Sequence, residues 1–151
     1  MAKRILGVDL GKKRVGLAIT DPLNIITSPF KTLEYKSKRQ LVEDLKEIIN
    51  EKEIGTIVFG LPTTLSGTDS QKTTETRKLV NFVRNQLPDD ILIEFEDEAL
   101  TTVEAHDIMH QMGKKPSKNR DIVDQIAAQC ILKAYQNHKR TQKSQTPPAS
   151  D

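Results

Sequence analysis

The stretch RILGVDLGKKRVGLAIT, residues 4–20, decides the fold class of this chain. Residues 4–9 form a nearly continuous apolar run, which is typical of a strand buried on both faces of a sheet. Gly11 and the two lysines after it are a turn signal, and residues 15–20 supply a second apolar strand at hairpin distance. We therefore expect the chain to begin with an antiparallel hairpin whose first strand is covered by other elements.

The rest of the chain alternates strands with helices. A weaker strand over 25–34 contains Pro29, which favours an edge position or an irregularity, and Ser37 is expected to cap a helix over 38–52. The further expected elements are a strand over 56–59, a helix ending near 86, a strand over 91–97, a helix over 101–112 and a final helix opened by Asp121. Strands separated by helices pair in parallel, so we predict an α/β fold. Its five-stranded mixed sheet, of order 3-2-1-4-5, is flanked by helices.

Length and composition indicate one globular domain. The chain has 151 residues, and we expect a single domain over 1–140 followed by a disordered polar tail over 141–151. The single Cys130 excludes an internal disulfide framework and fits a reducing cytoplasm. The net charge is only +2 at pH 7, but basic segments over 1–14 and 113–143 flank an acidic middle. If these segments meet in space, they form a positive surface that the net charge hides.

Carboxylates occur at the ends of two of the predicted strands and at the start of the last helix. The first strand ends at Asp9, the fifth ends at Asp97 and Glu98, and the helix begins with Asp121 and Asp124. In open α/β sheets the functional crevice lies at the carboxyl ends of the parallel strands. Clustered carboxylates bind hard cations such as Mg²⁺, and two such ions clamp the oxygens of a phosphodiester undergoing hydrolysis. This is the chemistry that converging acids would serve.

Each of these acids also has a structural interpretation. Asp9 could be a turn residue, although a charge that ends a dry apolar run needs a partner or a metal. Asp97 and Glu98 could be solvated charges at a strand end. Asp121 is expected to be an N-cap, and Asp124 could be its capping-box partner. From the residues alone, the functional interpretation is favoured only at Asp9, and Asp124 stays open.

Four short motifs in a fixed order make the chain similar to a known family. They are GVDLG at 7–11 followed by RVGLA at 14–18, GLP at 60–62 with GT at 67–68, DE at 97–98 with LTT at 100–102, and VD at 123–124 leading into AA at 127–128. Over about residues 3–137 the chain resembles the YqgF family, also called RuvX-like. Members of this family are described as pre-16S rRNA nucleases or as Holliday-junction resolvases, with an RNase H-like fold.

The resemblance implies a set of site residues. Asp9, Glu98 and Asp124 match the acidic triad of the family, which would be catalytic and would hold Mg²⁺ or Mn²⁺. Glu98 would act as the third ligand or as the base that orients water. The family usually has arginine where this chain has Ala99, and this departure bears on phosphate affinity or substrate choice. Asp121 is close enough in sequence to share or replace the role of Asp124.

Basic residues on either side of the predicted acid cluster are expected to bind the nucleic-acid backbone. They are Lys12, Lys13 and Arg14 after the first strand, and Lys114, Lys115, Lys118 and Arg120 before the last helix. Such contacts give weak, salt-sensitive binding. The expected partners are structured RNA or branched DNA, with ribosomal precursor particles as a further candidate. The chain is expected to be a monomer or weak homodimer.

The function that this resemblance implies is a metal-dependent endonuclease that processes the 5′ end of pre-16S rRNA in ribosome biogenesis. The alternatives are a Holliday-junction resolvase in DNA recombination and repair, and a non-catalytic nucleic-acid-binding module with the same fold. An actin-like or sugar-kinase-like ATPase is disfavoured. The hairpin around Asp9 is similar to the first phosphate motif of those enzymes, but they need two such domains and 151 residues supply one.

Overall fold

The computed structural model describes residues 3–11, 13–61, 71–97 and 120–145. Within these ranges the strands are β1 (Arg4–Leu10), β2 (Arg14–Thr20), β3 (Thr27–Glu34), β4 (Ile54–Leu61) and β5 (Leu92–Asp97), and the helices are α1 (Lys38–Lys52), α2 (Gln71–Gln86) and α4 (Arg120–Gln145). The strands form one sheet of order β3-β2-β1-β4-β5. The β1–β2 and β2–β3 pairs are antiparallel, whereas β1–β4 and β4–β5 are parallel. The predicted mixed sheet and its strand order are confirmed.

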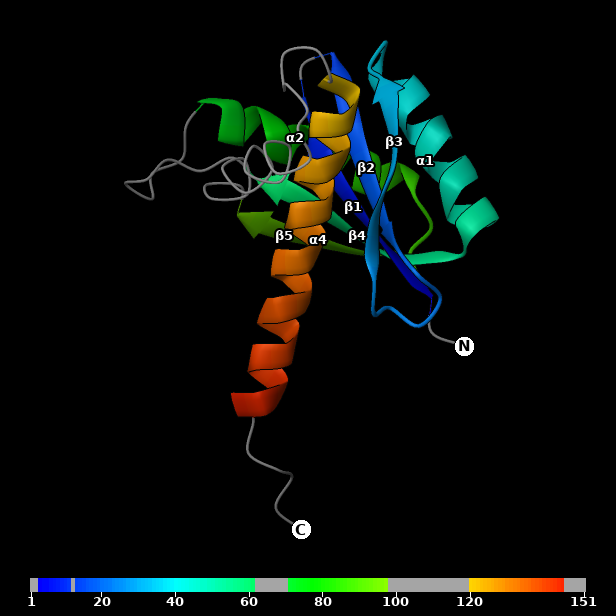
Figure 1. Cartoon of the computed structure of the whole chain (residues 1–151). Coiled ribbons are helices and arrows are strands. Elements are labelled where there is room, and N and C mark those ends of the chain that lie inside the picture. Colours follow the sequence, from blue (N-terminus) through cyan, green and yellow to red (C-terminus); the bar gives the residue numbers. More distant parts are fainter. Residues whose placement is uncertain (1–2, 12, 62–70, 98–119, 146–151) are drawn as a thin grey trace.

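Helices cover both faces of the sheet, with α4 alone across one face in the described part and α1 and α2 on the other (Figure 1). Side-chain alternation along β1 explains this division, because successive residues of a strand point to opposite faces. Leu6, Val8 and Leu10 pack into the larger apolar core with α1 and α2. Gly7 and Asp9 therefore belong to the face that α4 crosses. No helix in the described ranges is long and apolar enough to span a membrane.

Helix α1 begins at the cap that its sequence predicts and ends at a residue in the left-handed conformation. The Ser37 hydroxyl accepts a hydrogen bond from the backbone N–H of Gln40 at 3.1 Å, which satisfies one of the unpaired donors of the first turn. At the other end Glu53 adopts a left-handed conformation with φ of 54°, and its N–H donates to the Ile49 carbonyl. The predicted helix over 38–52 and its cap are confirmed.

Strand β3 is an edge strand with a local irregularity at its proline. The β2–β3 register shifts between Leu17 and Ala18, which pair with Lys31 and Pro29 respectively. Phe30 is thus the additional residue of a β-bulge. Proline lacks the N–H that a central strand needs, so its place beside a bulge on an edge strand agrees with the prediction.

Two glycines allow α4 to lie directly on the backbone of the sheet. A Cβ atom added at Gly16 in β2 would lie 2.1 Å from the carbonyl oxygen of Asp124 in α4. A Cβ atom added at Gly7 in β1 would lie 2.8 Å from the carbonyl oxygen of Ala128 and 2.6 Å from Cγ of Leu132. These three residues of α4 follow one another at intervals of four and so share one face of the helix. Any side chain at either glycine would push this face away from the sheet.

Three details differ from the sequence-based expectations. The last helix begins at Arg120, so Asp121 lies in its first turn and is not the N-cap. The same helix runs to Gln145, five residues into the predicted tail over 141–151, because arginine, lysine and glutamine make up most of residues 140–145 and the first proline beyond them is Pro147. Strand β4 extends beyond the predicted strand over 56–59 at both ends. The predicted helix over 101–112 lies outside the described residues.

The close approach at Gly16 can be tested by adding one methyl group. We expect Gly16→Ala to lower the free energy of unfolding by about 1–3 kcal/mol, because the methyl group overlaps backbone atoms that are fixed by a helix. Urea denaturation measures this. Gly55→Ala in β4 is the matched control, because the three atoms nearest its new methyl group all belong to the side chain of Lys3, which lies at the start of the chain. Equal losses in the two variants would contradict the proposed constraint.

Candidate functional site

The fold places Asp9 and Asp124 at neighbouring positions on one face of the sheet. Asp9 lies near the carboxyl end of β1, and its cross-strand partner in β2 is Gly16. Paired residues of antiparallel strands have Cα atoms about 4.5–5.5 Å apart. The backbone of Asp124 lies directly over Gly16, where an added Cβ would approach its carbonyl carbon to 2.3 Å. The backbones of two acidic residues from opposite ends of the sequence therefore lie close to each other.

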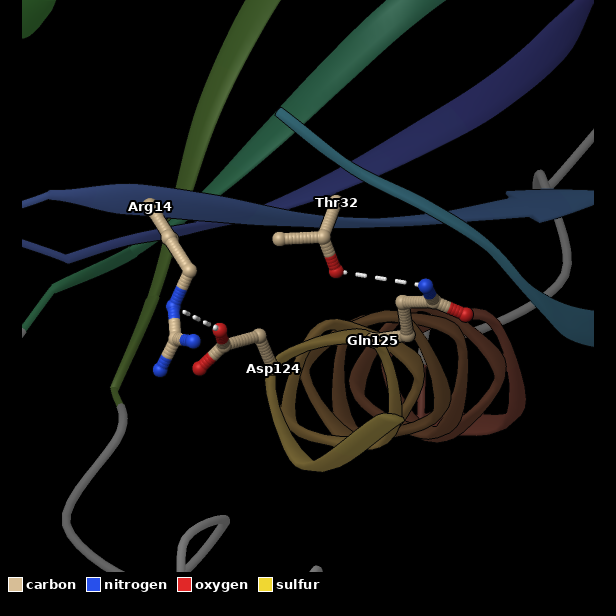
Figure 2. A network of polar contacts seen from close by, with 4 residues as sticks. All are labelled: Arg14, Thr32, Asp124 and Gln125. Carbon is tan, nitrogen blue, oxygen red and sulfur yellow. Dashed lines mark hydrogen bonds and ion pairs between the residues drawn. The ribbon is translucent and has the colours of Figure 1, made fainter. Parts of the chain in front are cut away.

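Asp124 forms an ion pair with Arg14, the first residue of β2 (Figure 2). Its Oδ2 atom is buried and lies 3.3 Å from Nε of Arg14. The side chains of Arg14 and Asp124 are 34% and 25% exposed, so solvent still reaches part of this pair. The guanidinium compensates the charge of a carboxylate that the packing of α4 has partly withdrawn from water.

The residue after Asp124 attaches α4 to a second strand. The side-chain amide of Gln125 donates a hydrogen bond to the Thr32 hydroxyl in β3 at 3.2 Å. Figure 2 shows the two contacts next to each other, one to β2 and one to β3. Further along α4 the Gln129 amide donates to the Thr27 carbonyl at the other end of β3. The orientation of the helix that carries Asp124 is thus fixed by several contacts.

The two carboxylates have the chemistry of ligands for a hard divalent cation. Mg²⁺ and Mn²⁺ prefer carboxylate oxygens, and the buried Oδ2 of Asp124 already has a positive group beside it. Among the described residues, however, no group of three His, Cys, Asp or Glu side chains is close enough to hold a metal. The described part therefore contains two of the three predicted ligands, Asp9 and Asp124, and Glu98, the third, lies outside it.

The other predicted site residues fall into two groups. Lys13 is described and lies exposed in the turn between β1 and β2. Arg120 is the first residue of α4, close in the helix to Asp124, although its side chain and that of Asp121 are not among those described. The predicted residues outside the described ranges are Lys12, Glu98, Lys114, Lys115 and Lys118. The role of each predicted site residue stays a prediction.

Strand β5 contains a buried acid that the sequence analysis did not single out. Glu96 is only 8% exposed, and its Oε1 atom lies 2.7 Å from Nδ1 of His138 in α4. Glu96 pairs with Gly60 of β4, and two residues earlier Glu94 pairs with Val58. Val58 packs against residues of α4, so both pairs lie on the α4 side of the sheet. Alternation with Phe95, which packs against the other core, places Glu96 on the opposite face but does not show that this face is buried. Asp97 then falls on the side of the sheet opposite α4.

Sequence comparisons link the chain to one family over nearly its whole length. A family model described as "RuvX: Holliday junction resolvase" matches residues 3–138. A protein of Clostridium botulinum (strain Alaska E43 / Type E3) named "Putative pre-16S rRNA nuclease" is 41% identical over 135 residues, which cover 87% of this chain and 95% of the relative. A protein of the same name from Acetivibrio thermocellus is 34% identical over 137 residues, covering 90% and 96%.

Solved structures with little sequence similarity share the fold. The fowlpox virus resolvase, solved with Holliday junction DNA, superposes with a TM-score of 0.59 at 10% identity and covers 90% of this chain and 98% of its own. RuvC of T. thermophilus, solved with a Holliday junction substrate, gives a TM-score of 0.56 at 11% identity, covering 93% and 96%. The expectation of an RNase H-like fold is therefore confirmed.

The Arg14–Asp124 contact can be tested for a structural role with a double-mutant cycle. Because both side chains are partly exposed, we expect a coupling energy below about 1 kcal/mol between Arg14→Gln and Asp124→Asn. Urea denaturation of the two single variants, the double variant and the wild type gives this energy. A coupling of several kcal/mol would instead indicate that the pair exists mainly to hold α4 on the sheet.

Proposed function

This chain belongs to the RuvX family, and we propose that it is a nuclease that hydrolyses phosphodiester bonds in structured nucleic acid. The observation that carries the proposal is the position of Asp124 over Gly16, the cross-strand partner of Asp9. A protein that only binds nucleic acid gains nothing from carboxylates next to phosphates, because like charges repel. A nuclease needs them for catalysis, and the basic residues nearby would hold the polyanion.

RNA is the favoured substrate, with the 5′ end of pre-16S rRNA as the site of cleavage. Support comes from relatives that are 34–41% identical over most of the chain and carry the name "Putative pre-16S rRNA nuclease". A four-way DNA junction is the second candidate, because the family description names a Holliday junction resolvase. The resolvases of known structure are only 10–11% identical to this chain, so they support the fold and not the choice of substrate.

In the proposed mechanism Asp9 and Asp124 would hold Mg²⁺ or Mn²⁺, with Glu98 as the third ligand or as the base that orients the attacking water. The metal would activate that water and neutralise charge on the phosphate. Arg14 would change its partner from Asp124 to a substrate phosphate, because both are anions within reach of one guanidinium. Lys13 would bind the backbone from the β1–β2 turn. The expected setting is the cytoplasm, with ribosomal precursor particles as partners.

The nuclease proposal predicts that cleavage depends on Asp9. We expect Asp9→Asn to reduce cleavage of a pre-16S rRNA fragment by at least about 100-fold, because a lost metal ligand costs at least as much as a lost outer-shell contact. A gel assay with Mn²⁺ or EDTA measures this, with a four-way DNA junction as the second substrate.

Asp89→Asn is the matched control for this assay, because Asp89 is an exposed carboxylate in the connection between α2 and β5. It should cleave like the wild type. Cleavage that survives EDTA, or survives in Asp9→Asn, would contradict the proposed mechanism. If the folded wild type binds RNA but cuts neither substrate, the non-catalytic binding module becomes the better account.

A second prediction concerns competition between Arg14 and the metal. In the absence of nucleic acid we expect Arg14→Gln to bind Mn²⁺ about two- to fivefold more tightly than the wild type, because the metal no longer displaces a cation from Asp124. Electron paramagnetic resonance of free Mn²⁺ measures this without any activity. Arg84→Gln, an exposed arginine in the last turn of α2, is the control. Equal affinities in the two variants would show that Arg14 and Mn²⁺ do not compete.

A further inference from the structure

A depression of about 720 Å³ lies beside the carboxylate pair, between the β1–β2 turn and the junction of β3 with α1. We call it the hairpin depression. Its lining residues include Lys13, Arg14, Tyr35, Lys36 and Asp124. It is within the range of volumes typical of ligand sites in proteins. Tyr35 and Lys36 are not among the predicted site residues.

Backbone hydrogen bonds fix the walls of the hairpin depression. The N–H of Gly11 donates to the Arg14 carbonyl at 2.9 Å and closes the β1–β2 turn. The N–H of Tyr35 donates to the Lys13 carbonyl at 2.7 Å and holds the β3–α1 junction against that turn. Two segments that carry lysines are therefore kept side by side. A site whose walls are already in place loses less conformational entropy when it binds a ligand.

The charge of the hairpin depression favours an anion. Lys13, Arg14 and Lys36 supply three positive charges, against the two carboxylates of Glu34 and Asp124. Arg14 already compensates Asp124. A divalent cation at Asp124, as in the proposed function, would make the balance still more positive. Lys13 and Lys36 are exposed, so their ammonium groups are accessible to a polymer that passes across this surface.

We propose that the hairpin depression is a phosphate subsite, which holds a phosphodiester adjacent to the one that is cleaved. The inference rests on the proposed function, because it takes the Asp9–Asp124 pair as the point of cleavage. Since Asp124 lines the depression together with Lys13 and Lys36, a strand whose scissile phosphate lies at that pair would have a neighbouring phosphate within reach of these lysines. These lysines would fix the register of the strand without reading its sequence.

Binding measured without cleavage tests the subsite. The protein carries Asp9→Asn, and the probe is an RNA hairpin with a single-stranded 5′ extension and a 3′-fluorescein label, followed by fluorescence anisotropy over a range of salt concentrations. We expect Lys13→Gln and Lys36→Gln each to reduce the slope of log Kd against log salt by about 1, and the double variant to reduce it by about 2. Lys133→Gln, an exposed lysine further along α4, should leave the slope unchanged.

The outcomes separate this inference from the proposed function. Slopes that match the Lys133→Gln control in all lysine variants would overturn the subsite, even if the wild type cuts RNA. If the lysine variants reduce the slope but the wild type cuts no substrate, the phosphate site is supported and the nuclease proposal is contradicted.

Two versions of the probe, with a 5′-hydroxyl and with a 5′-phosphate, distinguish an internal phosphodiester from a terminal phosphate. Equal effects of the lysine variants on both probes support the internal phosphodiester. Effects seen only with the 5′-phosphate probe would overturn it.

Discussion

The contact of α4 with the bare backbone of β1 and β2 is the constraint on which the rest of the structure depends. Gly7 and Gly16 have no side chains, so the helix lies closer to the sheet than any other residue would allow. The interior of a protein is close-packed, and a displacement of the helix at either point would move all of its inward residues together. Asp124 is one of these residues. The geometry of the candidate site is therefore a consequence of two glycines that do not themselves carry any chemistry.

The two faces of the sheet carry different kinds of residues. The face under α1 and α2 carries the larger apolar core, whose fully buried members include Leu6, Leu17, Leu45, Ile57 and Phe59. The face under α4 has a smaller apolar cluster and carries the polar groups of the site. A rigid core on one side can thus support charged groups on the other, where burial is partial and each charge needs a partner. The Arg14–Asp124 pair and the contact of His138 with Glu96 meet this need on the α4 side.

Much of the fold could be predicted from local patterns. The hairpin of residues 4–20, the Ser37 cap and the edge position of Pro29 follow from side-chain alternation, capping and the missing proline N–H, all of which act within a few residues. The approach of α4 to Gly16 could not be predicted this way, because it joins residues more than 100 positions apart. The sequence identified Asp9 and Asp124 as candidates. It did not predict the contact of Asp124 with Arg14, because these two residues are also far apart in the chain. Family motifs supplied the choice of Glu98, which the described residues do not test.

We propose that the glycine-dependent contact of α4 forms a metal site from Asp9 and Asp124. The most direct test is anomalous scattering at the manganese edge from crystals of the protein soaked in Mn²⁺. We expect an anomalous peak bonded to a carboxylate oxygen of each of the two residues, with Arg14 displaced from Asp124. A fully soaked crystal without a peak between these carboxylates, or with Mn²⁺ bound only elsewhere, would contradict it.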